Sequence, residues 1–550
     1  MKKRKSGIFL ILALMFVGLF VGCGKSEKKD EGPSIKPLNI LAMSSNITLA
    51  QVVQSQLKKV GISSKITEKK DYSTYLDDLV NGSFDITAAG WTTVTGNPDY
   101  AVMSLFHTNG DYNRYGLADK ELDMNLELGR TAKIGSSQFK EAYKNVEKII
   151  NEKAYIVPLY AGQRTLGTSK DLEGVILAKS RSFILEKLKW SKESGKSDET
   201  DPVYIRHTTV ALTSLDPIKA NDGTVFSINT NLYSRLVNLD PNDQIVSGLA
   251  SSWYSNDQTN FYFSIQENAK FSNGATITPE DIKFSLDRAK DKNTLGNRVY
   301  TVQGSMKNIE ILDRDLVDKD IIVELSKNGT AVSKKIIKIE TKEAYGQLYN
   351  MLAHTSGGIV SKDAIEKFGD SYGDVNNINS LVSSGPYVLD ALDKQKNEIR
   401  FVRNEYYYDK AIIKNIIYKV IPDASGSVLA LQSGDVNYIY TIPEDSRESV
   451  DAGEKTNLIA RASNGFTYLA FNNGVGGPRV TTNEDFRKAM YYAIDPQEIL
   501  TIVLNGNGKI GASPLSPVVD GTGNETGYKR PSYNIEKAKK YLEKYKATLN

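Results

Sequence analysis

The sequence has 550 residues, which exceeds what one hydrophobic core usually organises, so at least two lobes are expected. Hydrophobic residues make up 40% of the chain and charged residues 25%, a balance that is typical of a folded protein and excludes a disordered chain. The net charge of +3 is too small for a strongly cationic surface, so no nucleic-acid partner is expected.

Residues 1–22 have the pattern of a signal peptide. The basic residues Lys2 to Lys5 precede an apolar run from Gly7 to Val21 that contains no charge. At about fifteen residues this run is shorter than the ~20 that a membrane-spanning helix needs, and no later run approaches that length. We therefore expect export, removal of residues 1–22 and a mature protein that does not span the membrane.

The residues from Leu19 to Cys23 resemble a lipobox, at which a cysteine is diacylated through its sulfur and becomes the new N-terminus. Phe20 departs from that pattern, where leucine is usual. Cys23 could instead be a buried small residue or one half of a disulfide. It is the only cysteine, however, which excludes an internal bridge, and it follows the apolar run directly. We expect a lipid on Cys23 that anchors the chain to the outer face of a cell membrane, with residues 23–36 as a polar tether of up to ~40 Å.

Residues 37–190 alternate between strand and helix patterns. A strand is predicted at 38–42, an amphipathic helix at 49–60 and a second strand at 62–68, which together form a βαβ unit. A helix at 72–80 and an apolar strand at 84–90 follow. This order predicts an α/β lobe, with return strands, whose sheet lies between helices.

Residues 191–201 contain no apolar side chain, so they are a linker candidate. After them, period-two patterns at 203–212, 244–253 and 260–266 predict strands, and residues 202–390 are assigned to a β-rich lobe with a small subdomain. Thr278, Pro279 and Asp281 form an N-cap signature that predicts a helix to Arg288. Residues 391–550 are assigned to the remainder of both lobes, ending inside the α/β lobe with a helix at 534–545.

Several short motifs after residue 212 recur in one known family. In chain order they are Thr213-Ser214-Leu215-Asp216-Pro217, Ile245 to Trp253, Phe271-Ser272-Asn273-Gly274 with Asp281, Ser384-Gly385-Pro386-Tyr387, Arg403-Asn404, Ser433-Gly434-Asp435, Phe471-Asn472 and Asp485 to Asp495. Their order and spacing resemble the extracellular solute-binding proteins of family 5, which feed oligopeptides, dipeptides or nickel to ABC importers. The resemblance implies a two-lobed fold of the periplasmic-binding-protein type, of α/β class, with an extra subdomain.

The order of the motifs differs from that of the family. A helix similar to the one at 536–542 is followed in the family by further strands and helices, and residues 38–99 and 156–160 match that description. The chain therefore resembles a circular permutant in which residues 191–201 join the old ends, and exposed, neighbouring termini make such an exchange physically reasonable. The alternative is a rearranged gene.

The resemblance also implies where a ligand binds. In the family an extended peptide lies between one strand of each lobe, and the matching segments here are Ala211-Leu212-Thr213 and Ala89-Gly90-Trp91-Thr92. Trp91 could equally be a buried aromatic residue at a strand end. Family members that bind a free α-amine carry an aspartate three residues after this tryptophan, where the present chain has Val94. Unless Asp99 or Asp111 replaces it, the ligand's amine is blocked or exposed, or the ligand is not a simple peptide.

Other chemistry finds little support in the sequence. His107, His207 and His354 lack metal-ligand spacing, so no metal and no cofactor are expected, although His207 leaves a metal chelate or a haem-like ligand open. No GxSxG, P-loop or HExxH motif is present, so no enzymatic activity is expected. The leading hypothesis is a monomeric, lipid-anchored receptor that captures a peptide or small-molecule ligand and hands it to the permease subunits of an ABC importer. An extracellular sensor on the same fold is the second hypothesis, and a secreted hydrolase is the third.

Overall fold

The computed structural model describes residues 35–180, 183–212, 214–219, 223–294, 296–303, 305–327, 329–512, 514–519 and 526–549. The predicted signal peptide, Cys23, most of the tether and Thr213 lie outside the described residues. Among the residues that are described, no helix is both long enough and apolar enough to cross a bilayer.

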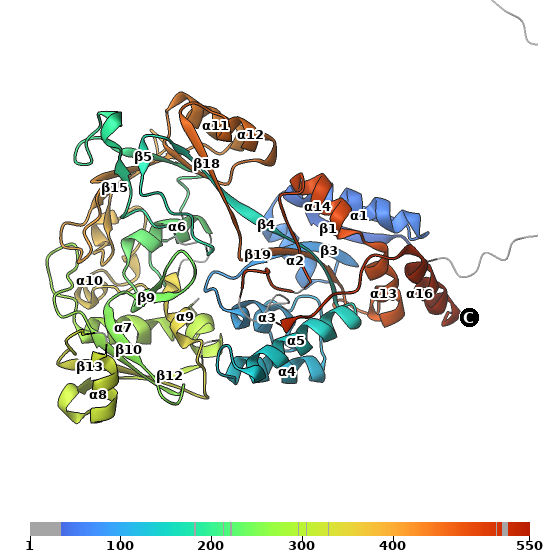
Figure 1. The fold of residues 1–550 in the computed structure, drawn as a ribbon, viewed down its shortest axis with the longest axis horizontal. Coiled ribbons are helices and arrows are strands. Elements are labelled where there is room, and N and C mark those ends of the chain that lie inside the picture. The colour runs from blue at the N-terminus through green and yellow to red at the C-terminus, as the bar shows by residue number, and fades with distance from the viewer. Residues whose placement is uncertain are drawn as a thin grey trace, which may run out of the picture.

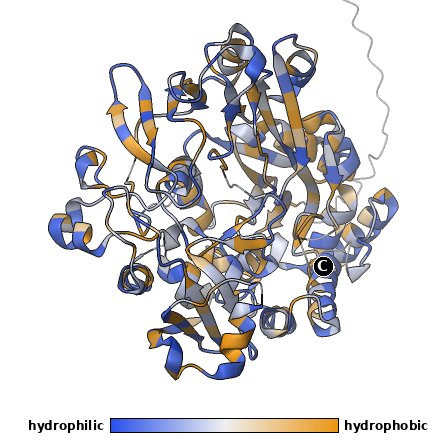
Figure 2. Cartoon of the chain, turned by 60° about the vertical axis from the view of Figure 1, so that its left-hand side comes forward, coloured by the Kyte–Doolittle hydropathy of each residue, from blue (hydrophilic) through white to orange (hydrophobic). Residues whose placement is uncertain are grey.

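The described chain forms two lobes that share one twelve-stranded sheet (Figure 1). The main path of the sheet runs in the order β14-β15-β16-β7-β17-β4-β19-β3-β1-β2. The strands from β19 to β2 belong to the α/β lobe and those from β14 to β17 to the β-rich lobe. Hydrophobic segments lie along strands of the interior, and hydrophilic residues occupy many of the outer turns (Figure 2).

The α/β lobe is a three-layer sandwich. Leu38, Ile40 and Ala42 of β1 pack into one apolar cluster and Leu41 into another, because successive side chains of a strand point to opposite faces. Strands β2 and β3 pair with β1 in parallel. The elements of this lobe are β1 (Leu38–Met43), α1 (Ile47–Lys59), β2 (Ser64–Lys69), α2 (Tyr72–Val80), β3 (Ile86–Thr92), α3 (Pro98–Phe106), α4 (Lys120–Thr131), α5 (Ser137–Glu152), β19 (Gly465–Phe471), α13 (Glu484–Ala493), α14 (Pro496–Leu504), β20 (Gly508–Ile510) and α16 (Ile535–Ala547).

The β-rich lobe has its own apolar core, which contains Leu166, Ile205 and Phe401 among its buried residues. Its elements are β5 (Leu172–Glu173), β6 (Lys189–Trp190), β7 (Val203–His207), α6 (Gly223–Leu232), β8 (Val237–Leu239), β9 (Ile245–Ser247), α9 (Leu348–Leu352), α10 (Lys362–Phe368), β14 (Tyr387–Asp393), β15 (Glu398–Arg403), β16 (Asn415–Val420), α11 (Ala424–Ser433), β17 (Tyr438–Tyr440), α12 (Arg447–Asp451) and β18 (Thr456–Ala462). The predicted mixed α/β fold is therefore confirmed.

A separate four-stranded antiparallel sheet builds a subdomain on this lobe, in the order β10-β11-β13-β12. Its elements are β10 (Ala250–Tyr254), β11 (Asn260–Ile265), α7 (Pro279–Ala289), β12 (Met306–Asp313), α8 (Lys319–Ser326) and β13 (Lys335–Thr341). The single strand predicted at 244–253 is divided between β9 and β10 at Gly248, where an added Cβ would lie 2.4 Å from the carbonyl oxygen of Arg235. This close approach turns the chain from one sheet into the other.

Two strands cross between the lobes and form the hinge. β4 (Ile156–Ser169) pairs with β19 near its start and with β17 and β18 near its end. The chain crosses a second time at Ser463 and Asn464, between β18 and β19. Figure 1 shows β4 running through the middle of the molecule beside this second crossing. Two adjacent crossings of this kind allow lobes to rotate as rigid bodies about short segments.

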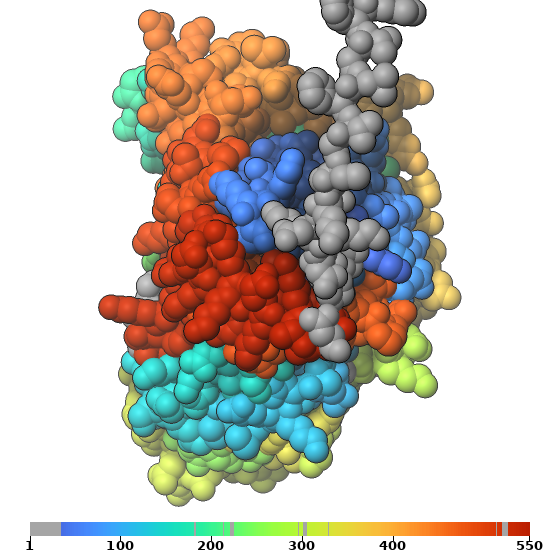
Figure 3. Space-filling model, turned by 90° about the vertical axis from the view of Figure 1, so that its right-hand side faces the viewer, coloured from blue at the N-terminus to red at the C-terminus, as the bar shows by residue number. Residues whose placement is uncertain are grey.

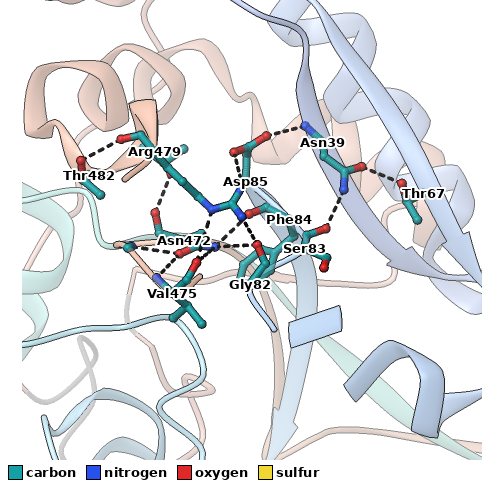
Figure 4. Close-up of polar contacts among 12 residues, drawn as sticks. Asn39, Thr67, Gly82, Ser83, Phe84, Asp85, Asn472, Val475, Arg479 and Thr482 are labelled. Atoms are coloured by element: carbon teal, nitrogen blue, oxygen red, sulfur yellow. Dashed lines mark hydrogen bonds and ion pairs between the residues drawn. The ribbon is translucent and has the colours of Figure 1, made fainter. Parts of the chain in front are cut away.

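A polar network ties the first part of the chain to the last part within the α/β lobe (Figure 4). Arg479 Nη1 lies 3.2 Å from Asp85 Oδ1, and Asp85 Oδ2 accepts a 2.7 Å hydrogen bond from the amide of Asn39. The side-chain amide of Asn472 donates to the carbonyl oxygens of Gly82, Phe84 and Val475. The Phe471-Asn472 motif thus has a structural role, because it holds the turn that leads into β3.

The predicted linker at 191–201 is folded against the β-rich lobe. The amide of Trp190 donates to Asp198 at 2.8 Å, and its indole donates to the carbonyl oxygen of Asp201 at 3.0 Å. Arg403, which is buried, bonds to Glu199 at 2.9 Å. The segment is therefore an ordered connection between β6 and β7.

Candidate functional site

A cleft of about 660 Å³ lies between the lobes, under the hinge. The α/β lobe contributes Gly90, Trp91, Thr92 and Val94, while the β-rich lobe contributes Phe226, Arg298 and His354. The hinge itself supplies Gly162, Gln163 and Ser463. Rotation about the hinge would therefore change the width of this cleft.

The edge of β3 that faces the cleft is open. Strand β1 pairs with β3 only at Ile86 and Thr87, and β19 occupies the other edge from Ile86 to Thr92. In the described part of the chain, the stretch from Ala88 to Thr92 thus has no strand partner on the β1 side. A smaller cavity of about 150 Å³, lined by Ala88, Ala89, Gly90 and Trp91, adjoins this edge. Backbone groups on such an edge can pair with an extended chain.

Aromatic side chains form much of the cleft wall. Trp91 contacts Tyr112 edge to face, with ring centroids 5.0 Å apart, and lies 5.8 Å from Tyr100. Tyr160 and Phe466 also line the cleft. Walls of this composition present large apolar faces together with hydroxyl groups, which suits ligands with varied side chains.

A second cavity of about 540 Å³ opens beside the first, and both are lined by Thr92 and Ser463. Its charged side chains are Arg164 on β4 and Arg206 on β7. Hydroxyl-bearing residues dominate the rest of the lining, namely Thr92, Thr165, Thr208, Ser227, Tyr440, Thr441 and Ser463, and Phe183 and His207 complete it. The two cavities therefore adjoin at Thr92 and Ser463, the first rich in aromatic side chains and the second containing two arginines.

Val94 lines the first cavity and packs on the core of the subdomain. Neither carboxylate that could have replaced the missing aspartate lines either cavity. Asp99 is fully buried and accepts a 2.8 Å hydrogen bond from Tyr345, while Asp111 lies 3.9 Å from Arg298 Nε. No aspartate or glutamate lines the two cavities within the described residues.

Asp99 belongs to a contact that ties the lobes together. Tyr345, whose hydroxyl binds Asp99, packs in the subdomain core, and the Arg130 guanidinium lies over its ring at 5.3 Å. Arg130 Nε also lies 3.5 Å from Glu343. Burial raises the pKa of Asp99 to about 6, against the opposing effect of Arg130.

The histidines have different surroundings. His354 lines the first cavity and its Nδ1 lies 2.7 Å from the Ser356 hydroxyl, and burial lowers the pKa of its imidazole to about 3, so it is neutral at physiological pH. His207 lines the second cavity, with Nδ1 donating to the carbonyl oxygen of Thr209 at 2.8 Å. His107 lies apart from both, 3.4 Å from Glu127. Among the described residues, no group of three or more His, Cys, Asp or Glu side chains could hold a metal ion.

The predicted binding strand of the β-rich lobe is not a strand. β7 ends at His207 rather than at 212, because the chain turns there, with Thr209 Oγ1 accepting from the amide of Ala211. Ala211 is exposed, Leu212 is buried in the core, and Thr213 lies outside the described residues. Ala89, Gly90, Trp91, Thr92 and Val94 do come together at the cavities. Arg164 and Arg206 have no family signature near them and were missed.

Comparison with known proteins identifies the family. The sequence profile described as bacterial extracellular solute-binding proteins, family 5 Middle, matches residues 25–113 and 244–550. Similar curated proteins include the glutathione-binding protein GsiB of Salmonella typhi, which is 24% identical over 56% of this chain and 54% of its own length. Others are the probable D,D-dipeptide-binding periplasmic protein DdpA of Escherichia coli, 25% identical over 55% of each chain, and the periplasmic murein peptide-binding protein MppA of Escherichia coli, 26% identical over 57% of each.

Solved structures were also compared with this chain. The murein tripeptide-binding protein MppA of Escherichia coli matches 64% of this chain and 65% of its own, at 20% identity and a TM-score of 0.45. The pheromone receptor PrgZ matches 64% of this chain and 69% of its own, at 19% identity and a TM-score of 0.44. The chain thus spans little more than half the length of the curated relatives it matches. Because the profile covers well over half of the sequence, the chain belongs to the bacterial extracellular solute-binding proteins of family 5.

Proposed function

We propose that this protein is a receptor that captures an extended peptide, or a solute of similar size, between its lobes and delivers it to the permease subunits of an ABC importer. The observation that carries the proposal is the open edge of β3 from Ala88 to Thr92, of which Gly90, Trp91 and Thr92 line the cleft of about 660 Å³. Main-chain pairing with that edge would hold peptides of many sequences, since backbone groups are common to all of them.

The names of the relatives support a ligand of this size. They describe a glutathione-binding protein, a probable D,D-dipeptide-binding protein and a murein peptide-binding protein, and all three ligands are short and peptide-like. A binding protein also agrees with the lack of a catalytic motif in the sequence.

Attachment to the membrane is part of the proposal. A lipid on Cys23 and a tether to residue 36 would keep the receptor, as a monomer, near its permease at the extracellular face. Globomycin-sensitive processing and metabolic labelling with a fatty acid would test the anchor, and Cys23→Ser should abolish the label.

A permuted chain order is a further part of the proposal. The family profile matches in two segments, and α1, from the first segment, shares an apolar cluster with α13 and α16, from the second. Figure 3 shows residues from the beginning (blue) and the end (red) of the chain side by side on one face. The folded connection at 191–201 is what a join between former termini would require.

Isothermal titration calorimetry with pooled short peptides, followed by native mass spectrometry of the complexes, tests the binding function. Peptides should bind with 1:1 stoichiometry, and Trp91→Ala should weaken binding by roughly tenfold or more, as loss of a buried aromatic contact does. Trp253→Ala, in the subdomain, is the matched control. If no peptide binds while a nickel chelate or haem does, the ligand class proposed here is wrong.

A further inference from the structure

The two cavities of the site carry charge of one sign only. Arg298 lines the first cavity, Arg164 and Arg206 line the second, and no carboxylate lines either one within the described residues. Arg298 is partly balanced by Asp111, 3.9 Å away. The second cavity is therefore the more strongly cationic of the two, and a cleft focuses such a potential.

The arginines of the second cavity are held by backbone carbonyl groups. Arg206 donates from Nε to Ile421 at 2.9 Å and from Nη2 to Pro422 at 3.0 Å, and Arg164 donates from Nη1 to Ala178 at 3.0 Å. The two carbonyl oxygens hold the Arg206 guanidinium in place without neutralising its charge. Asp423, a carboxylate that acts on Arg206, caps α11 through the amide of Gly426 and does not line the cavity.

Arg206 is thus a partly buried cation, and it makes no ion pair within the described residues. Burial lowers the pKa of its guanidinium by removing hydration, against an opposing effect of Asp423. An anionic group that entered the cavity would compensate for this lost hydration, and the hydroxyl-bearing residues Thr208 and Thr441 offer further donors.

We propose that the cleft selects ligands that carry a carboxylate, which binds in the cavity of Arg164 and Arg206, and that no described residue of either cavity pairs with a ligand ammonium. This inference rests on the proposed function and names the ligand class for the same site. A peptide would bind with its C-terminal or side-chain carboxylate at Arg164 and Arg206 and its remaining residues along β3 towards Trp91.

The test uses one set of apolar tetrapeptides in four forms, with the amine free or acetylated and the carboxylate free or amidated. Amidation should weaken binding at least tenfold, because a charge-assisted hydrogen bond is lost, whereas acetylation should change the affinity less than about threefold. Calorimetry on the full purified chain measures both ratios.

The variants Arg206→Gln and Arg164→Gln test whether the second cavity causes the loss of affinity on amidation. Each variant should bring the ratio of the affinities for the free acid and the amide close to one. Each should also keep the wild-type affinity for the amidated peptide, whereas a variant that failed to fold would bind neither form. Arg314→Gln, an exposed arginine beside Asp315 in the subdomain, should keep the wild-type ratio.

The outcomes separate the two proposals. Equal binding of acid and amide, or strong loss on acetylation, overturns the carboxylate inference while leaving a peptide receptor in place. Failure of all four forms to bind contradicts the proposed function itself and the inference with it.

Discussion

At the scale of single residues, Val94 determines whether the cleft can bind a free α-amine of the ligand through an ion pair. It occupies the place where amine-binding relatives are expected to carry aspartate, and its side chain lines the cleft. Val94→Asp should create a preference for free-amine peptides over acetylated ones of roughly tenfold, through a new ion pair. Val94→Asn has the same shape without the charge and should show no such preference. Calorimetry with both peptide forms would decide, and equal preference in the two variants would contradict the prediction.

Asp99 should make stability depend on pH. Its pKa is raised from 3.8 to about 6, and the corresponding stabilisation, up to about 3 kcal/mol, is complete below 3.8 and lost as the pH rises through about 6. Asp99→Asn removes this titration. The free energy of unfolding of the wild type, relative to Asp99→Asn, should therefore decline between pH 4 and pH 7 in urea titrations.

Asp315, whose side chain is 86% exposed, gives the control for that comparison. The pH dependence of Asp315→Asn should follow the wild type. A wild-type curve that runs parallel to that of Asp99→Asn would show that Asp99 titrates at its ordinary pKa.

Residue patterns pointed to residues on one wall of the cleft and to none of the arginines of the second cavity. Gly90, Trp91 and Val94 were found because they follow one another in a recognisable motif. Arg164 and Arg206 lie on strands that are far apart in sequence, and β17 lies between those strands in the sheet. A cavity that such residues line leaves no local spacing to detect.

At the scale of elements, the sequence predicted a helix or strand correctly where the residues of that segment themselves favour it. The helix predicted after Thr278 is α7, with both hydrogen bonds of its capping box present. The helix at 72–80 and the strand at 260–266 also match α2 and β11 closely. The strand predicted to 212 is wrong because a turn at Thr209 replaces it. The length of β4 was missed because pairing with four other strands, not its own sequence pattern, stabilises it.

The capping box of α7 should contribute measurably to stability. Thr278 Oγ1 accepts a 3.1 Å hydrogen bond from the amide of Asp281, and Asp281 accepts one of 3.0 Å from the amide of Thr278. Thr278→Ala should lower the free energy of unfolding by about 1 kcal/mol, while Thr278→Ser, which keeps the hydroxyl, should retain most of it. Urea denaturation of the two variants tests this, and equal losses would argue against the cap.

Two glycines of β4 provide a matched pair. At Gly167 an added Cβ would lie 2.7 Å from Ile442 Cδ1 and 2.8 Å from Leu431 Cδ2, whereas at Gly162 the nearest atom, of Leu504, is 3.5 Å away. Gly167→Ala should destabilise the protein by about 1–3 kcal/mol through overpacking. Gly162→Ala should be neutral or slightly stabilising, because alanine loses less entropy on folding. Thermal unfolding of both variants measures the stability effect of the same substitution at two positions of β4, and only Gly167→Ala should lower the melting temperature.

At the scale of the whole molecule, contacts between distant parts of the chain build the α/β lobe. Asp85 and Asn39 from the first part meet Arg479 from the last part, and α1 packs against the same cluster as α16. Because the contacts rather than the order of the segments stabilise the lobe, a different order should fold to the same structure. The displaced motifs of the sequence suggest a changed order of segments, and the structure shows the contacts between the first and last parts of the chain.

A re-permuted chain tests that argument. It would begin at Lys196 and end at Gly195, and a flexible linker would join Leu549 to Ile35. Gly195 lies in an exposed turn with no atom within 4 Å of an added Cβ, so the cut disturbs little. The melting temperature should stay within a few degrees of the original and ligand affinity within about threefold, since the contacts of both lobes are kept. A chain cut in β4 between Gly162 and Gln163 is the control and should fail to fold, because that cut severs a hinge crossing. If the cut at Gly195 is as damaging as the cut in β4, the order of segments matters and the permutation proposal is wrong.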